Sequence, residues 1–216
     1  MAVDVLVMPL ARYVTGNYVT PFMERVWAQQ GVYKILRPGL TGEEVLEEIP
    51  PGVPFGGLEA EARCAAISAE LAQCLTQYPE LAAALWDESA EPAFFGRVGH
   101  EPLWSLRWQA AALAEPKPSL LRRIARRLLG RRAAAPAATF AEANVFVPSV
   151  FDEPFELEAP QDLGVYDCGS LPRLVDELAL LAVSVEADTP EAHVLSTLIT
   201  AAETAGQRRL PLILDL

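Results

Sequence analysis

Residues 164–185, GVYDCGSLPRLVDELALLAVSV, decide the fold class of this chain. The segment opens with a strand pattern at 164–168. Ser170 stands where an N-cap residue is needed, before an apolar periodic run that predicts a helix to about Val185. A strand followed directly by a capped helix is typical of an α/β fold.

The same alternation recurs at both ends of the chain. An Asp-Thr-Pro-Glu start predicts a helix over 190–205, and an apolar run predicts a closing strand over 210–216. Near the N-terminus, an apolar strand over 2–10 precedes a helix over 21–30, which begins with a Thr-Pro N-cap and ends at a glycine. A strand pattern at 32–36 follows. Strand, helix and strand in this order suggest a βαβ unit, which requires parallel strands.

The middle of the chain predicts further helices. Thr41-Gly42-Glu43-Glu44 matches a capping box and predicts a short helix that ends at Pro50. A long helix is expected from Leu58, because its apolar residues recur at steps of three and four. That stripe consists of Cys64, Ile67, Leu71, Cys74 and Tyr78. The remaining expected elements are a helix at 79–86, a strand at 93–98, a helix at 103–113 and strands at 144–148 and 155–158.

We therefore expect one α/β domain over 1–216, a mixed sheet with helices packed on it. The length of 216 residues suits a single large domain. Composition changes sharply at 114–139, where Pro- and Ala-rich joints flank a cationic stretch. This basic segment is predicted to be an inserted amphipathic helix within the domain.

Charge is divided unevenly along the chain. The formal net charge is −12, yet the basic segment contains seven cationic residues and no acid between 117 and 132, which leaves −19 for the remainder. Its apolar face could pack on the domain, dock on a protein, or lie on an anionic membrane through 118–132, and its cationic flanks could bind a phosphate-rich partner. The acidic remainder argues against nucleic-acid binding. The segment's candidate contact residues are Arg122, Arg123, Arg126 and Arg127.

Acidic residues gather around the predicted strand at 155–158. Aromatic and apolar residues alternate with them, and no base interrupts the run from 151 to 162. Such a surface suits a basic protein partner, because complementary potentials speed encounter and exclude wrong partners. A solvated surface without a partner is the alternative. The residues predicted to bind are Asp152, Glu153, Phe155, Glu156 and Glu158.

A thiol enzyme is a second hypothesis. Cys168 is expected at the end of a strand just before a helix N-terminus, where amides stabilise a thiolate, and Asp167 is adjacent. His100 or His193 would supply a base. A buried structural cysteine is the alternative, and Cys64 and Cys74 on the helical stripe are expected in the core.

No cofactor or metal is expected. Two His and three Cys form no zinc pattern, no calcium-binding loop is present, and the glycines at 52–57 lack the Gly-Lys-Ser/Thr of a phosphate loop. The four tryptophans are expected to anchor the core. The few cysteines, the lack of a cationic leader and the lack of an 18-residue apolar run predict a cytoplasmic protein. An excess of Arg (15) over Lys (2) favours a bacterial source.

The sequence thus favours a non-enzymatic binding protein of the immunity, inhibitor or adaptor type. Its partner is expected to be a protein with a basic surface. A cysteine-dependent hydrolase or transferase, or peripheral membrane association through 118–132, are the alternatives.

Overall fold

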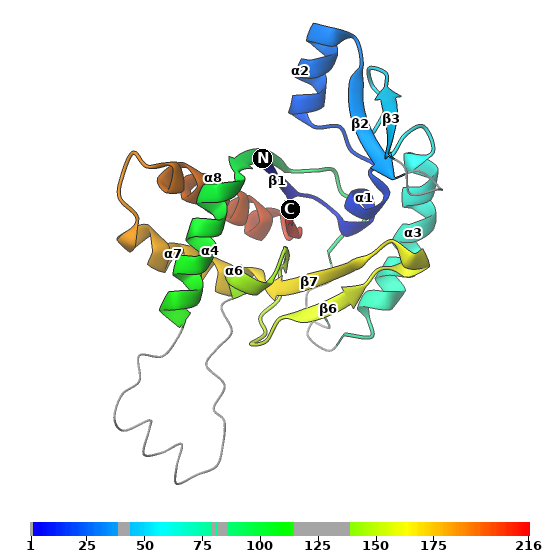
Figure 1. Ribbon diagram of the computed structural model, residues 1–216. Coiled ribbons are helices and arrows are strands. Elements are labelled where there is room, and N and C mark those ends of the chain that lie inside the picture. Colours follow the sequence, from blue (N-terminus) through cyan, green and yellow to red (C-terminus); the bar gives the residue numbers. More distant parts are fainter. Residues whose placement is uncertain (1, 39–43, 79–80, 82–85, 115–138) are drawn as a thin grey trace, which may run out of the picture.

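The computed structural model describes residues 2–38, 44–78, 81, 86–114 and 139–216 (Figure 1). A six-stranded sheet has the order β4-β1-β8-β5-β7-β6, and a separate sheet pairs β2 with β3. Six strands form the larger sheet: β1 (Ala2–Val7), β4 (Phe94–Gly99), β5 (Val145–Val147), β6 (Phe155–Glu158), β7 (Val165–Ser170) and β8 (Leu212–Asp215). The smaller sheet contains β2 (Tyr33–Pro38) and β3 (Glu44–Ile49).

Helices cover both faces of the larger sheet (Figure 1). One face packs against α4 (His100–Ala114), α7 (Leu171–Ser184) and α8 (Pro190–Arg208), with the short α6 (Thr139–Glu142) beside α4. The other side carries α1 (Leu10–Thr15) and α3 (Ala60–Leu75), which contact each other, and α2 (Pro21–Gln30) packs on β2. The sheet is mixed, since β5 and β7 run parallel and the other neighbours antiparallel. The prediction of an α/β domain is confirmed.

The predicted βαβ unit is wrong. β1 pairs antiparallel with β4 and β8, whereas β2 pairs with β3 in the separate sheet. Exposed Lys34 and Leu36 alternate with half-buried neighbours along β2. A parallel strand covered on both faces reads as a nearly continuous apolar run, so this alternating pattern suits a two-stranded hairpin instead.

The helix predicted to end at Pro50 is also wrong, because residues 44–49 form strand β3. Pairing with β2 brings opposite charges together, with Lys34 Nζ 2.9 Å from Glu48 Oε1. Glu47 is ion-paired with Arg37. Cross-strand partners therefore override the helical preference of the glutamates, and the capping-box residues 41–43 lie outside the described residues.

The predicted helix starts are confirmed by their caps. Thr20 Oγ1 accepts from Met23 N at 3.2 Å, and Thr189 Oγ1 accepts from Ala192 N at 3.1 Å. Ser170 Oγ accepts from the amide of Arg173 at the start of α7. The predicted helix at 79–86 lies largely outside the described residues, as does the basic segment apart from its two ends.

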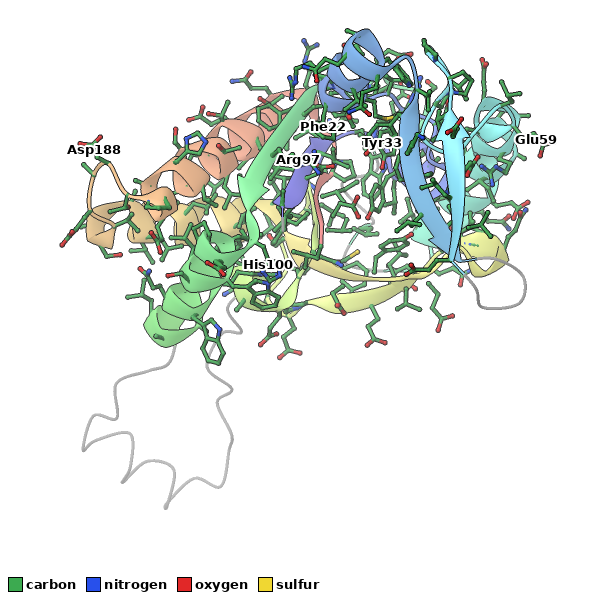
Figure 2. The ribbon with its side chains drawn as sticks, turned by 45° about the horizontal axis from the view of Figure 1, so that its top comes forward. Phe22, Tyr33, Glu59, Arg97, His100 and Asp188 are labelled. Carbon is green, nitrogen blue, oxygen red and sulfur yellow. The ribbon has the colours of Figure 1, made fainter. Side chains whose placement is uncertain are left out.

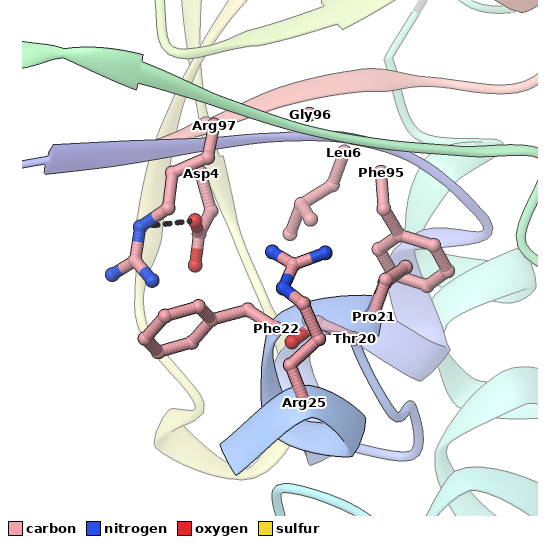
Figure 3. Close-up of a pocket in the computed structure, with 9 residues that line it drawn as sticks. All are labelled: Asp4, Leu6, Thr20, Pro21, Phe22, Arg25, Phe95, Gly96 and Arg97. Atoms are coloured by element: carbon pink, nitrogen blue, oxygen red, sulfur yellow. Dashed lines mark ion pairs between the residues drawn. The ribbon is translucent and has the colours of Figure 1, made fainter. Parts of the chain in front are cut away.

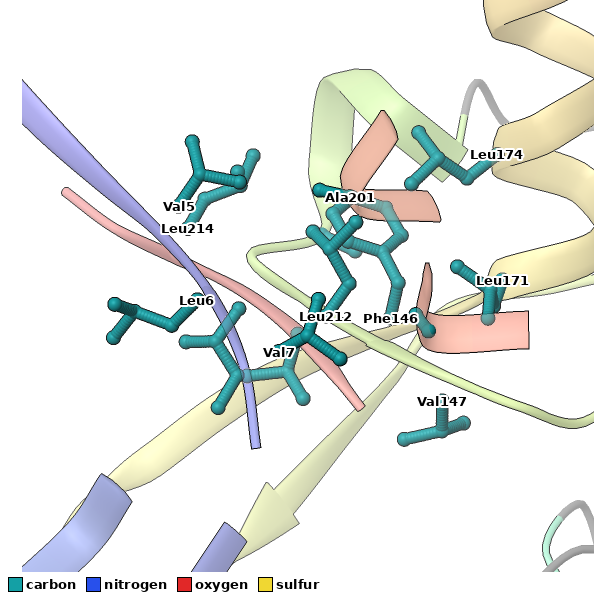
Figure 4. Packing of buried hydrophobic residues seen from close by; sticks show 14 of the residues in the cluster. Val5, Leu6, Val7, Phe146, Val147, Leu171, Leu174, Ala201, Leu212 and Leu214 are labelled. Carbon is teal, nitrogen blue, oxygen red and sulfur yellow. The ribbon is translucent and has the colours of Figure 1, made fainter. Parts of the chain in front are cut away.

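A large apolar core lies between the sheet and the helices (Figure 4). Val5 and Leu214 from the centre of the sheet, Phe146 from β5 and Leu174 from α7 all expose 1% of their area or less. Full burial of each such side chain stabilises the fold by about 2 kcal/mol before conformational entropy is subtracted. Among the described residues, no helix is both long and apolar enough to cross a bilayer.

A second, smaller core lies inside the hairpin lobe, which we define as α2, β2 and β3. Its buried residues are Met23, Trp27 and Ile49, and Trp27 Nε1 donates to Ile49 O at 2.9 Å. The lobe joins the rest of the chain where Gly56 N donates to Gly16 O at 2.7 Å. A Cβ at Gly16 would lie 2.6 Å from Gly56 N, so only glycine permits this close backbone contact.

Candidate functional site

Strand β6 carries the predicted acidic and aromatic residues at one edge of the larger sheet. Phe155 and Leu157 point to the side of α3, where Leu157 is fully buried. The Phe155 ring lies 5.0 Å from that of Tyr78 and 5.3 Å from that of Phe151. Phe155 thus belongs to an intramolecular aromatic cluster, while alternation along the strand turns Glu156 and Glu158 to the opposite face.

Three exposed carboxylates share that opposite face. Glu156 is directly across from Asp167 of β7, and Glu158 is across from the exposed Val165. None of the three carboxylates forms an ion pair with a described residue. Like charges directly opposite each other destabilise a sheet by up to about 1 kcal/mol. We call Glu156, Glu158 and Asp167 the acidic face.

The other predicted binding residues differ from these. Asp152 has its carboxylate 3.4 Å from Arg173 Nη1, and its backbone carbonyl accepts from the same guanidinium. Glu153 is exposed. The structure therefore brings Glu156 and Glu158 together on one face of the sheet, where Asp167 joins them. Asp152 is instead ion-paired with Arg173. The candidate residues Arg122, Arg123, Arg126 and Arg127 lie outside the described residues.

Two tryptophans of α4 are exposed, against the prediction that all four anchor the core. Trp104 and Trp108 expose 37% and 75% of their area, whereas Trp27 and Trp86 are buried. The Arg107 guanidinium lies 5.2 Å from the Trp104 ring centroid and donates to Phe140 O at 2.7 Å. Burial lowers the pKa of Arg107 to about 10, and the charge of Asp167 opposes that shift. Arg107 thereby links α4 to α6, and its charge interacts favourably with that of Asp167.

The cysteine hypothesis gains no support from the geometry. Cys168 is fully buried within β7, and burial followed by the charge of Asp167 raises the pKa of its thiol. Asp167 points to the opposite face of the same strand. His100 Nε2 accepts from Trp104 Nε1 at 2.6 Å, and His193 is exposed in the first turn of α8. In α3, Cys64 is buried as predicted and Cys74 is half-buried.

A row of charged residues that was not predicted from the sequence crosses three adjacent strands, β4, β1 and β8. Arg97 of β4 is opposite Asp4 of β1, which in turn is opposite Asp215 of β8. Arg97 Nε lies 3.3 Å from Asp4 Oδ1, and Tyr13 OH donates to Asp215 Oδ1 at 2.9 Å. Burial raises the pKa of Asp4, Arg97 opposes this, and Asp215 adds to it. These side chains share the sheet face that looks toward the hairpin lobe.

A small cavity of about 90 Å³ adjoins Asp4 (Figure 3). Phe22 lies under Arg97, with the guanidinium carbon 4.0 Å from the ring centroid. The Arg25 guanidinium points into the cavity toward Leu6 (Figure 3). Figure 2 shows Arg97 of β4 close to Phe22 and Tyr33 of the hairpin lobe.

A larger cavity of about 240 Å³ adjoins Asp215. Asp215 forms no ion pair with any described residue. Burial and then the charge of Asp215 raise the pKa of both Tyr13 and Tyr166, as well as that of Tyr18. Tyr18 stacks on Phe55 with ring centroids 5.8 Å apart. The same cavity is lined by two cationic side chains, Arg37 and Arg63.

A buried carboxyl group, Glu88, stands apart from both sites. It accepts from Ala11 N at 2.8 Å and from the indole N–H of Trp86, so it caps α1, whose N-cap residue is Pro9. Burial raises its pKa to about 7, although both hydrogen bonds act in the other direction. We assign it a structural role as the cap of α1.

The lone aspartates in two otherwise apolar strands were the signal in the sequence for this charged row. Residues 2–7 read AVDVLV and residues 212–215 read LILD.

Among the described residues, no group of three or more His, Cys, Asp or Glu side chains is placed to hold a metal ion. No protein-family model, curated protein or solved structure matches this chain.

Proposed function

We propose that this protein is a non-enzymatic, cytoplasmic binding protein that neutralises or recruits a protein partner with a basic surface. It would act as an immunity protein, inhibitor or adaptor, with the acidic face as its contact surface. The observation that carries the proposal is the like-charge pair formed by Glu156 and Asp167 in register on β6 and β7.

Edge protection alone does not account for this pair. Charged side chains on an edge strand keep it from pairing with other chains, and this is sufficient reason for Glu156 and Glu158 on β6. Asp167, however, is on β7, which has strands on both sides. Its charge gives the edge no added protection, and its repulsion from Glu156 costs stability, an effect that the favourable charge interaction of Asp167 with Arg107 partly offsets. A cation placed between the two carboxylates removes that cost, and an Arg or Lys of a partner is such a cation.

The charge of the chain and an exposed tryptophan also suit protein recognition. The −19 charge outside the basic segment attracts a basic protein over a long range and raises the rate of encounter. Trp108 offers a large exposed apolar surface on α4. Tryptophan is among the residue types that most often dominate binding energy at protein interfaces.

Capture with three baits tests the proposal. The baits are the wild-type protein, an acidic-face variant and a control variant with the same change in charge, each cross-linked in lysate of the source cells and compared by quantitative mass spectrometry. The acidic-face variant is Glu156→Gln/Glu158→Gln/Asp167→Asn. The control, on exposed sites around α8, is Glu186→Gln/Asp188→Asn/Glu203→Gln.

We expect a basic protein to be retained by the wild-type and control baits and lost from the acidic-face bait. With the purified partner, the acidic-face variant should bind at least 10-fold more weakly, whereas the control stays within about twofold. Equal affinity of the acidic-face variant and the wild type at 50 mM salt would show that the contact surface lies elsewhere.

A further inference from the structure

We propose that the cavity beside Asp215 binds a small zwitterion of the amino-acid class. The ligand ammonium would contact Asp215, and its carboxylate would contact Arg37 and Arg63. This site is separate from the acidic face and does not depend on the function proposed for that face.

The cationic end of the ligand is matched by Asp215 and its tyrosines. The neighbouring Asp4 has Arg97 as a counter-ion, whereas Asp215 accepts one hydrogen bond, from Tyr13, and has no ion pair among the described residues. The side chain is half-buried, so water screens its charge incompletely. Tyr18 and Tyr166 line the same cavity. Aromatic rings around a carboxylate are a typical site for an organic ammonium group.

The anionic end is matched by two anchored guanidinium groups. Arg37 is ion-paired with Glu47 and donates to Phe55 O, and Arg63 donates to Gly56 O. A guanidinium has five N–H donors in a planar fork, so these bonds fix each group and leave donors for a ligand. Arg side chains held in this way suit bidentate recognition of a carboxylate.

The cavity holds both signs of charge, and this selects for a zwitterion. Tyr18 lines the cavity together with Asp215 and Arg37, and Asp215 adds to the burial that raises the pKa of Tyr18 while Arg37 lowers it. A simple amine would meet two guanidinium groups, and a simple acid would meet Asp215. The volume of about 240 Å³ corresponds to roughly eight water molecules at ~30 Å³ each, which is enough for a small amino acid.

The cavity also lies where ligand sites are common, between two separately packed parts of a chain. Arg37 and its partner Glu47 belong to the hairpin lobe, whereas Asp215 and Tyr166 belong to the larger sheet. Phe55 packs against both cores. A bound zwitterion would therefore bridge the lobe and the sheet and stabilise the folded protein by mass action.

Thermal unfolding and calorimetric titration test this inference. Each of the twenty L-amino acids is used as a probe at 10 mM, and the best one is compared with its decarboxylated amine and its deaminated acid. The site variants are Asp215→Asn, which keeps an acceptor for Tyr13, and Arg63→Gln. The control is the acidic-face variant Glu156→Gln/Glu158→Gln/Asp167→Asn.

We expect at least one amino acid to raise the melting temperature and to bind at least 10-fold more tightly than either singly charged analogue. Asp215→Asn and Arg63→Gln should each weaken binding at least 10-fold, and the control should bind as the wild type does. If one site variant does not fold, the other gives the result. No binding at 10 mM, equal binding by the amine, or unchanged affinity in the folded site variants would overturn the proposal.

Discussion

Two pairs of acidic residues occupy the same sheet in the same geometry and in different environments. Glu156 and Asp167 are directly opposite each other on one face, and Asp4 and Asp215 are directly opposite on the other. The first pair is exposed and forms no ion pair with described residues. The second is half-buried, with Arg97 beside one member and Tyr13 bonded to the other.

The comparison shows that surroundings, and not register, decide what a carboxylate pair can do. In water, the exposed pair is screened and repels itself weakly. Near the hairpin lobe, burial raises the pKa of Asp4. Each half-buried carboxylate there needs a specific partner, and Asp215 has only a neutral one among the described residues. The exposed pair thus suits a large charged surface, whereas the half-buried pair suits one small ligand.

Glu88 extends the comparison to nearly complete burial and gives the largest expected effect. Its pKa is about 7 in the folded protein and 4.5 in the unfolded reference. Between these values the folded state binds the extra proton, so the free energy of unfolding should fall as pH rises through this window, by up to ~3 kcal/mol. Urea unfolding of the wild type and Glu88→Gln from pH 4.5 to 7.5 measures this.

The relevant quantity is the difference between the two proteins at each pH, since other carboxyl groups titrate in both. The wild type should lose stability relative to Glu88→Gln as pH rises. A difference that stays constant with pH would mean that burial does not shift the pKa of Glu88. Glu88 would then not serve as the buried example in this comparison of carboxyl groups.

Arg97→Met removes the counter-ion of the half-buried pair. We expect a loss of about 1–2 kcal/mol of unfolding free energy at pH 7, because Asp4 is left without a partner in a partly desolvated site. The matched control is Lys34→Met, which breaks the exposed pair with Glu48 and should cost less than about 0.5 kcal/mol. Urea unfolding measures both. Equal losses of unfolding free energy in the two variants would mean that partial burial of Asp4 does not increase the cost of removing its counter-ion.

Glu156→Gln relieves the exposed pair, and we expect a smaller effect than for Glu88→Gln or Arg97→Met. We expect a gain of about 0.5 kcal/mol of unfolding free energy at low salt, because the repulsion from Asp167 is removed. The gain should vanish in 0.5 M NaCl. Glu158→Gln, opposite Val165, should change stability less, and urea unfolding at both salt concentrations separates the two. A loss of stability in Glu156→Gln would contradict the account of the acidic face.

Local sequence patterns predicted most helices and strands, but they did not predict which strands pair with one another. Caps at Thr20, Ser170 and Thr189 act within four residues, so the sequence alone locates these helix starts. The strand at 44–49 was predicted as a helix, because its glutamates are paired by residues of β2. Local patterns contain no information on which distant segment will be the neighbour.

The candidate sites follow the same rule. Alternation along one strand was enough to place Glu156 and Glu158 on a common face. The position of Asp167 beside them depends on the register of β6 with β7, which the sequence pattern did not reveal. The pair of Asp4 and Asp215 comes from opposite ends of the chain, and no spacing in the sequence connects them.

Strand β8 lies between β1 and β5 in the larger sheet. Without residues 212–215, the sheet would consist of two unconnected pieces, β4 with β1 and β5 with β7 and β6. During synthesis, those pieces must wait with open edges until the last of the strands emerges. The helices on either side can form early, but the sheet can close only when β8 is inserted. A delay in the insertion of β8 would therefore prolong the period in which the two pieces expose open strand edges to other chains.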